Sequence, residues 1–209
     1  MKNLKKLVLV SSLIIAANAA QAAESRNGIY GGVEANHQKL SLAGQERFYE
    51  VKSSAPSVLL GYRFGQVVDL EVNYMQTSGS KSGLSDASQG ISNGSTKVKV
   101  QSVSLDALKT FRPFDSLQPL GFFGLVSVSA NKAEISESGN FFGQPNAAKS
   151  SATGLGYGFG GGVSYDLTDS ATIRVKVKHS VLNLSTSGLA GTGGVNDATV
   201  VSVGALYRF

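Results

Sequence analysis

The chain has 209 residues, no cysteine and a formal net charge of +5. The lack of cysteine excludes disulfides, thiolate metal sites and cysteine nucleophiles. Three of the 19 basic residues, Lys2, Lys5 and Lys6, lie in a segment that we expect to be removed, which leaves 16 basic residues against 14 acidic ones. No run rich in lysine or arginine remains, so the sequence indicates no nucleic-acid partner.

Residues 1–22 have the pattern of a signal peptide. The lysines are followed by an apolar run over residues 7–17 and by Ala20-Gln21-Ala22, which fits the small-x-small pattern of a cleavage site. The run is shorter than the roughly 20 residues that a spanning helix needs. We therefore expect residues 1–22 to be an export signal and residues 23–209 to form one domain.

Apolar and polar residues alternate in eight segments, which predicts an all-β fold. In chain order the predicted strands are Gly28–Gln38, Ser57–Phe64, Val68–Gln76, Lys97–Lys109, Leu120–Ser129, Leu155–Asp166, Ala171–Leu182 and Ala198–Phe209. Long predicted loops at Lys39–Pro56, Thr77–Thr96, Ala130–Gly154 and Asn183–Asp197 alternate with short turns at Gly65–Val67, Thr110–Pro119 and Leu167–Ser170. This alternation is typical of outer-membrane barrels, in which the long loops are extracellular and the short turns periplasmic.

The last strand gives the strongest indication of a membrane. Val201, Val203, Ala205, Tyr207 and Phe209 share one face, and Ser202, Gly204 and Arg208 share the other. A strand that is apolar on one face to its last residue suits the lipid-facing wall of a barrel. We therefore predict an eight-stranded antiparallel transmembrane β-barrel, monomeric and surrounded by lipid, in the outer membrane of a Gram-negative bacterium.

Five short motifs spread over the mature chain carry a resemblance to a known family. They are Ile29-Tyr30-Gly31-Gly32-Val33, Leu60-Gly61-Tyr62-Arg63-Phe64, Pro119-Leu120-Gly121-Phe122-Phe123-Gly124, Gly161-Gly162-Val163-Ser164-Tyr165-Asp166-Leu167 and Val203-Gly204-Ala205-Leu206-Tyr207-Arg208-Phe209. The chain resembles the small eight-stranded outer-membrane barrels of the OmpA/OmpX kind. The resemblance implies that Tyr207 and Phe209 belong to a C-terminal signal for the outer-membrane assembly machinery.

Charged residues on the polar faces of the strands predict a network inside the barrel. An eight-stranded barrel is narrow enough for side chains to fill it, and buried charges require partners. The third and seventh strands lie opposite each other in such a ring, so Asp69 and Glu71 can reach toward Arg174 and Lys176. The predicted network comprises Glu34, Arg63, Asp69, Glu71, Asp106, Arg174, Lys176 and Arg208. It is interpreted either as a structural plug or as the gate of a narrow porin-like channel, for which the glycines of the sixth strand leave space.

The other candidate chemistry is weak, and we expect no catalytic, cofactor or metal site. Residues 156–161 match G-x-G-x-x-G, but the glycines lie within a strand and no helix follows. His37 and His179 fall on strands that are not neighbours, which favours polar rim residues over a metal site. The pair His179 and Ser180 lacks the same-face geometry of a lipid A deacylase, because adjacent residues of a strand face opposite ways.

The long loops contain the candidate contact residues. Arg47, Phe48 and Tyr49 lie in the first loop, and Phe141 and Phe142 in the third. Aromatic and arginine side chains are enriched where interfaces concentrate their binding energy. The prediction is thus a barrel that displays surface loops, adhesin-like or serving envelope integrity, with a possible host or surface ligand. The alternative is the narrow channel.

Overall fold

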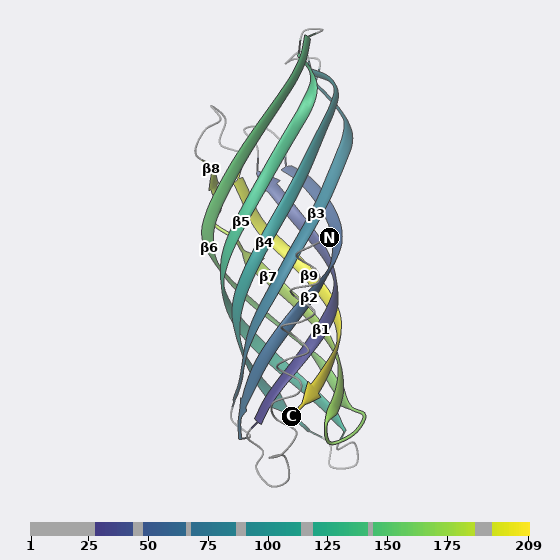
Figure 1. Cartoon of the computed structure of the whole chain (residues 1–209), viewed down its shortest axis with the longest axis vertical. Helices are drawn as coiled ribbons and strands as arrows, with labels where there is room; N and C mark the ends of the chain where they lie inside the picture. The colour runs from purple at the N-terminus through teal and green to yellow at the C-terminus, as the bar shows by residue number, and fades with distance from the viewer. Residues whose placement is uncertain are drawn as a thin grey trace.

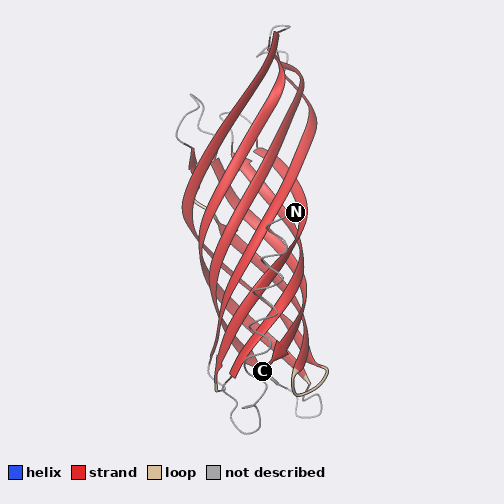
Figure 2. Ribbon diagram, in the orientation of Figure 1, coloured by secondary structure: helices blue, strands red, loops and turns tan. Residues whose placement is uncertain are grey.

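The computed structural model describes residues 28–43, 48–65, 68–86, 91–113, 119–141, 144–186 and 194–209, and strands dominate these segments (Figure 2). The strands are β1 (Gly28–Ala43), β2 (Phe48–Phe64), β3 (Val68–Asp86), β4 (Ile91–Phe111), β5 (Leu120–Phe141), β6 (Gln144–Asp166), β7 (Ala171–Val181), β8 (Ser185–Thr186) and β9 (Gly194–Arg208). Within the described segments, no helix is long and apolar enough to cross a membrane.

Eight of these strands close into a barrel. The order is β5-β4-β3-β2-β1-β9-β7-β6, each pair is antiparallel, and an additional β5–β6 pairing completes the ring. The two-residue strand β8 stands outside the ring order and pairs only with Ala152 and Thr153 of β6. The predicted fold class is confirmed, and in the half near the short turns, where all eight ladders are present, closure leaves no sheet edge, as a membrane requires.

The predicted strands are accurate at one end of the barrel and too short at the other. The short turns after β2, β4 and β6 fall where the sequence predicts them, and Gly65 adopts a left-handed φ of 60° in the first of them. Three of the four long loops were wrong, because most of Lys39–Pro56, Thr77–Thr96 and Ala130–Gly154 is strand. β5 and β6 reach 22 and 23 residues, about twice what a tilted strand needs to cross a bilayer.

The four strands β3–β6 rise above the rest of the ring as a tall wall (Figure 1). The β2–β3 ladder stops at Ser57 and Met75, and the β6–β7 ladder stops at Tyr157 and Val181. The ladders among β3, β4, β5 and β6 continue to the end of the strands. The longer strands therefore stand at the end opposite the short turns, which is the extracellular end of such a barrel.

The pattern of inside and outside reverses along the barrel. In the half near the short turns the outward residues are apolar and exposed, such as Val103, Leu105 and Val128, whereas inward Asp106 is buried. Further toward the extracellular end the outward face carries Lys97 and polar residues, while inward positions hold apolar ones. One buried apolar cluster fills the extracellular half and comprises Leu40, Val51, Val98, Val100, Ala133, Ile135, Ala152, Leu182, Leu184 and Ala198. The half near the short turns therefore has the residue distribution of a membrane-embedded barrel, and the extracellular half has that of a protein surrounded by water.

Candidate functional site

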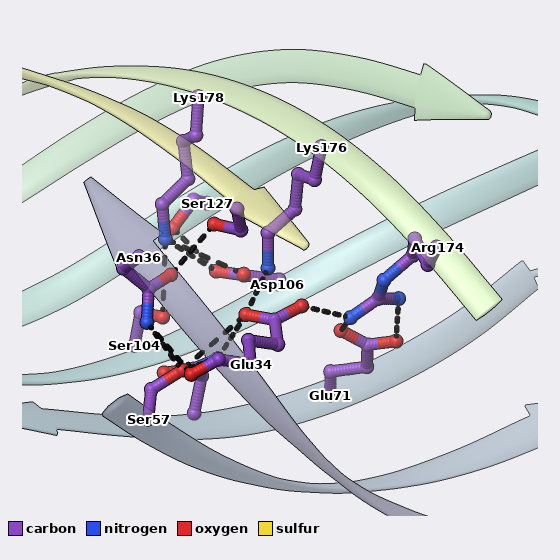
Figure 3. A network of polar contacts seen from close by, with 12 residues as sticks. Glu34, Asn36, Ser57, Glu71, Ser104, Asp106, Ser127, Arg174, Lys176 and Lys178 are labelled. Carbon is purple, nitrogen blue, oxygen red and sulfur yellow. Dashed lines mark hydrogen bonds and ion pairs between the residues drawn. The ribbon is translucent and has the colours of Figure 1, made fainter. Parts of the chain in front are cut away.

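Arg174 of β7 is the centre of a charge network inside the barrel (Figure 3). Its Nη2 donates to Glu34 Oε1 at 2.7 Å and to Glu71 Oε2 at 2.9 Å, and Nη1 donates to Glu71 Oε1. Lys176 Nζ donates to Glu34 Oε2 at 2.9 Å. All four side chains are at most 4% exposed. Two cations and two carboxylates from β1, β3 and β7 thus neutralise one another across the full width of the lumen.

Neutral side chains complete the hydrogen bonds of the two carboxylates. Tyr30 Oη donates to Glu71 Oε1 at 2.7 Å, and Asn73 Nδ2 donates to Glu34 Oε2 at 3.1 Å. Tyr30 reaches Glu71 by lying across Gly61, where an added Cβ would overlap the tyrosine ring. The close approach of the Tyr30 ring therefore requires a glycine at position 61. Each of the two carboxylates accepts hydrogen bonds from several partners rather than one.

A second group lies around Asp106 of β4. Ser127 donates to Asp106 Oδ1 at 2.6 Å, and Lys178 Nζ lies 3.4 Å from both carboxylate oxygens. Ser104 also accepts from Lys178, at 3.3 Å. Asp106 is fully buried, so Lys178 supplies the charge that compensates it.

The charges near the short turns form local pairs. Arg63 and Asp69 face each other on β2 and β3, with donor–acceptor distances of 2.9 Å and 2.8 Å. Arg112 pairs with Asp166. Arg208 Nη1 donates to the carbonyl of Asp169 at 3.2 Å.

The structure therefore brings together only part of the predicted network. Glu34, Glu71, Arg174 and Lys176 form its centre, but Asp69 does not reach across the barrel, because Arg63 lies directly opposite it on the next strand. Lys176 contacts Glu34 instead of a residue of β3. The sequence reasoning missed Tyr30 and Lys178. Lys178 shares the polar face of Arg174 and Lys176, and the same period-2 count could have found it.

Neighbouring groups lie close to the inward faces of the β6 glycines. A Cβ at Gly162 would come within 2.6 Å of the ring of Phe123, and one at Gly158 within 2.6 Å of Ser180 Oγ. The Phe123 ring also lies under the Arg174 guanidinium, with 5.6 Å between Arg174 Cζ and the centroid of the ring. Neighbouring side chains and backbone thus occupy the room beside Gly158 and Gly162, and the narrow channel stays a prediction.

Of the predicted loop contacts, Arg47 and Phe142 lie outside the described residues. Phe48, Tyr49 and Phe141 are placed only as strand backbone, at the extracellular ends of β2 and β5. The role of these five residues therefore stays a prediction.

The other singled-out residues are placed on the barrel wall. His37 lies on the outward face and contacts Ser54 Oγ at 3.0 Å, and His179 contacts Thr199 Oγ1 at 3.1 Å. Ser180 points inward and is buried, so it does not share a face with His179. At the C-terminus Tyr207 faces outward, and its ring packs edge-on against Phe209 with centroids 5.4 Å apart.

A closed antiparallel barrel with an apolar outer belt and a polar interior is the architecture of a transmembrane β-barrel. The model of the outer membrane protein beta-barrel domain family matches residues 7–209. The chain belongs to this family, and its place is the outer membrane of a Gram-negative cell, in contact with outer-membrane lipid.

Solved structures share the fold at low sequence identity. Neisserial surface protein A is similar at a TM-score of 0.60 with 20% identity, over 87% of this chain and 97% of that chain. A major outer membrane protein of Thermus thermophilus is similar at a TM-score of 0.56 with 14% identity, over 87% of this chain and 99% of that chain. A third structure is that of Ail, the attachment invasion locus protein of Yersinia pestis, in complex with the heparin analogue sucrose octasulfate. It is similar at a TM-score of 0.50 with 17% identity, over 87% of this chain and 99% of that chain. No curated protein sequence matches the chain.

Proposed function

We propose that this protein is a monomeric, non-catalytic outer-membrane barrel that acts through its extracellular end, as a surface-contact or adhesin-like protein. The observation that carries the proposal is the filling of the lumen in two layers. The charge network around Arg174 occupies the middle of the barrel, and the apolar cluster around Leu40 and Val98 closes the extracellular half. Because the described residues fill the interior in this way, the proposal places the activity at the extracellular end rather than in the lumen.

Paired strands carry the extracellular end of the wall. The pairing of β3–β6 extends to Asp86, Ile91, Phe141 and Gln144, with register shifts near the ends of β3 and β4. Sites held on strands are positioned more firmly than sites on loops. Ail, which has the same fold, is named for attachment and binds a polyanion analogue, which supports a contact role for this end. Phe141, the last residue of β5, and the adjacent Phe142, which lies outside the described residues, are the proposed contacts.

Adherence of whole cells tests this function. Bacteria that express the wild-type chain should adhere to epithelial cell layers more than cells with an empty vector. Replacing Phe141 and Phe142 together by serine should lower adherence at equal surface level, because an interface loses its apolar anchors. The matched control is Phe111→Ser, an exposed aromatic at the periplasmic end of β4. Equal adherence of the wild type and the empty vector would contradict a contact role.

A further inference from the structure

The outer face of the wall can be followed as rows of residues that pair across β3, β4, β5 and β6. The row Tyr74–Val103–Ala130–Leu155 is the last apolar one toward the extracellular end. The row below it is also apolar, and the row above it is polar, consisting of Gln76, Gln101, Lys132 and Thr153. The edge of the membrane's hydrocarbon region therefore falls between these two rows.

A groove of about 470 Å³ lies at this edge. Val103, Ala130 and Leu155 contribute apolar lining, and Gln101, Lys132 and Thr153 contribute polar lining. Ala130 is the smallest of the four outward side chains in its row, and it lies between Val103 and Leu155. Leu155 is 76% exposed. The groove thus has an apolar part toward the membrane and a polar part toward the aqueous side.

The polar row of the groove and the two rows above it carry more lysines than carboxylates. Lys132 and Glu134 lie on β5 and contact each other at 3.1 Å, and Glu134 is also paired in register with Lys99. The next row contains two further lysines on either side of Ser136. Over these three rows, four ammonium groups (Lys97, Lys99, Lys132 and Lys149) stand against one carboxylate, Glu134.

We propose that the groove binds a phosphorylated lipid of the outer leaflet, with an acyl chain against Val103, Ala130 and Leu155 and a phosphate beside Lys132 and Lys99. Ammonium groups near the surface of a bilayer attract anionic headgroups, and lysine binds phosphate as a point charge. A soluble polyanion would gain from the lysines but not from the apolar lining. The continuity of the groove with the apolar belt therefore favours a lipid over a soluble polysaccharide.

The proposal is tested by titrating the folded barrel, in a neutral detergent, with diphosphoryl lipid A and following complexes by native mass spectrometry. Replacing Lys132 and Lys99 together by glutamine should weaken binding about tenfold or more, since the phosphate loses two charge-assisted contacts. Lys109→Gln is the matched control, because Lys109 is an outward, exposed lysine at the periplasmic end of β4. It should bind like the wild type.

A second variant separates a lipid from a soluble polyanion. Ala130→Leu should fill the groove with a side chain that the membrane tolerates, and binding of lipid A should fall about tenfold. Ala205→Leu, on the outward face of β9, is its control. A heat-dependent shift in gel mobility establishes that each variant is folded. If the lysine variant weakens binding while Ala130→Leu does not, and heparin competes with the lipid, the surface binds soluble polyanions and the proposal is overturned. Equal binding by all variants overturns it as well.

Discussion

At the scale of residues, the barrel interior is held by buried charges that have several partners each. Arg174 donates to both Glu34 and Glu71, and Glu71 also accepts from Tyr30. Removing one member of such a group costs more than the group contributes, because the remaining charge stays buried without compensation. The arrangement is therefore sensitive to single substitutions, although replacing the whole group by apolar residues could leave the stability unchanged.

Glu71→Ala tests this sensitivity. We expect it to lower the free energy of unfolding by about 3–5 kcal/mol, since Arg174 would lose one of its two carboxylate partners in the buried network. Urea unfolding in lipid vesicles, followed by gel mobility, measures the change. Glu134→Ala is the control, because this exposed pair with Lys132 should leave the unfolding midpoint unchanged. A midpoint shift for Glu71→Ala no larger than for Glu134→Ala would contradict the account of the network.

At the scale of elements, the sequence predicts the strands correctly within the membrane but predicts loops where the strands continue above it. The turn residues set the periplasmic ends correctly, and the period-2 pattern identified every strand of the ring. Above the membrane the apolar residues change faces. On β4, apolar Val103 points outward, whereas apolar Val98 and Val100 point inward. The apolar residues thus move from odd-numbered to even-numbered positions, while the strand itself keeps its alternation of inward and outward side chains. The sequence therefore predicts loops for the segments rich in serine, glycine and asparagine that lie beyond this shift, toward the extracellular end.

The site was less predictable than the fold. Counting along a strand gives the face of a side chain, but not which partner it meets across the lumen. Asp69 and Glu71 share a face of β3, yet only Glu71 meets Arg174. The difference depends on the stagger between strands, which the sequence does not display.

Hydrogen exchange tests the extended strands. The amides of residues 97–101 and 131–135 should be protected as strongly as those of the membrane part, because they lie in continuous ladders over the apolar cluster. Mass spectrometry of the barrel in detergent, with peptides covering both parts, measures the protection. Exchange at the rate of unstructured chain would contradict the ladders.

At the scale of the whole molecule, one half of the barrel is suited to the membrane and the other half to water. The lower half is apolar outside and charged inside, and the upper half is polar outside and apolar inside. Their boundary is the row of Tyr74, Val103, Ala130 and Leu155, above which the lysines begin. We propose that the two fillings together close the lumen to solutes.

Conductance across a planar lipid bilayer tests the closure most directly. The folded wild-type barrel should insert without producing discrete current steps, because the charge network and the apolar cluster fill its interior. Antibody labelling of recovered vesicles would establish that the protein inserted. Stable current steps from the wild type that Glu71→Ala or Arg174→Ala changes in size would contradict the account and favour a narrow channel gated by these charges.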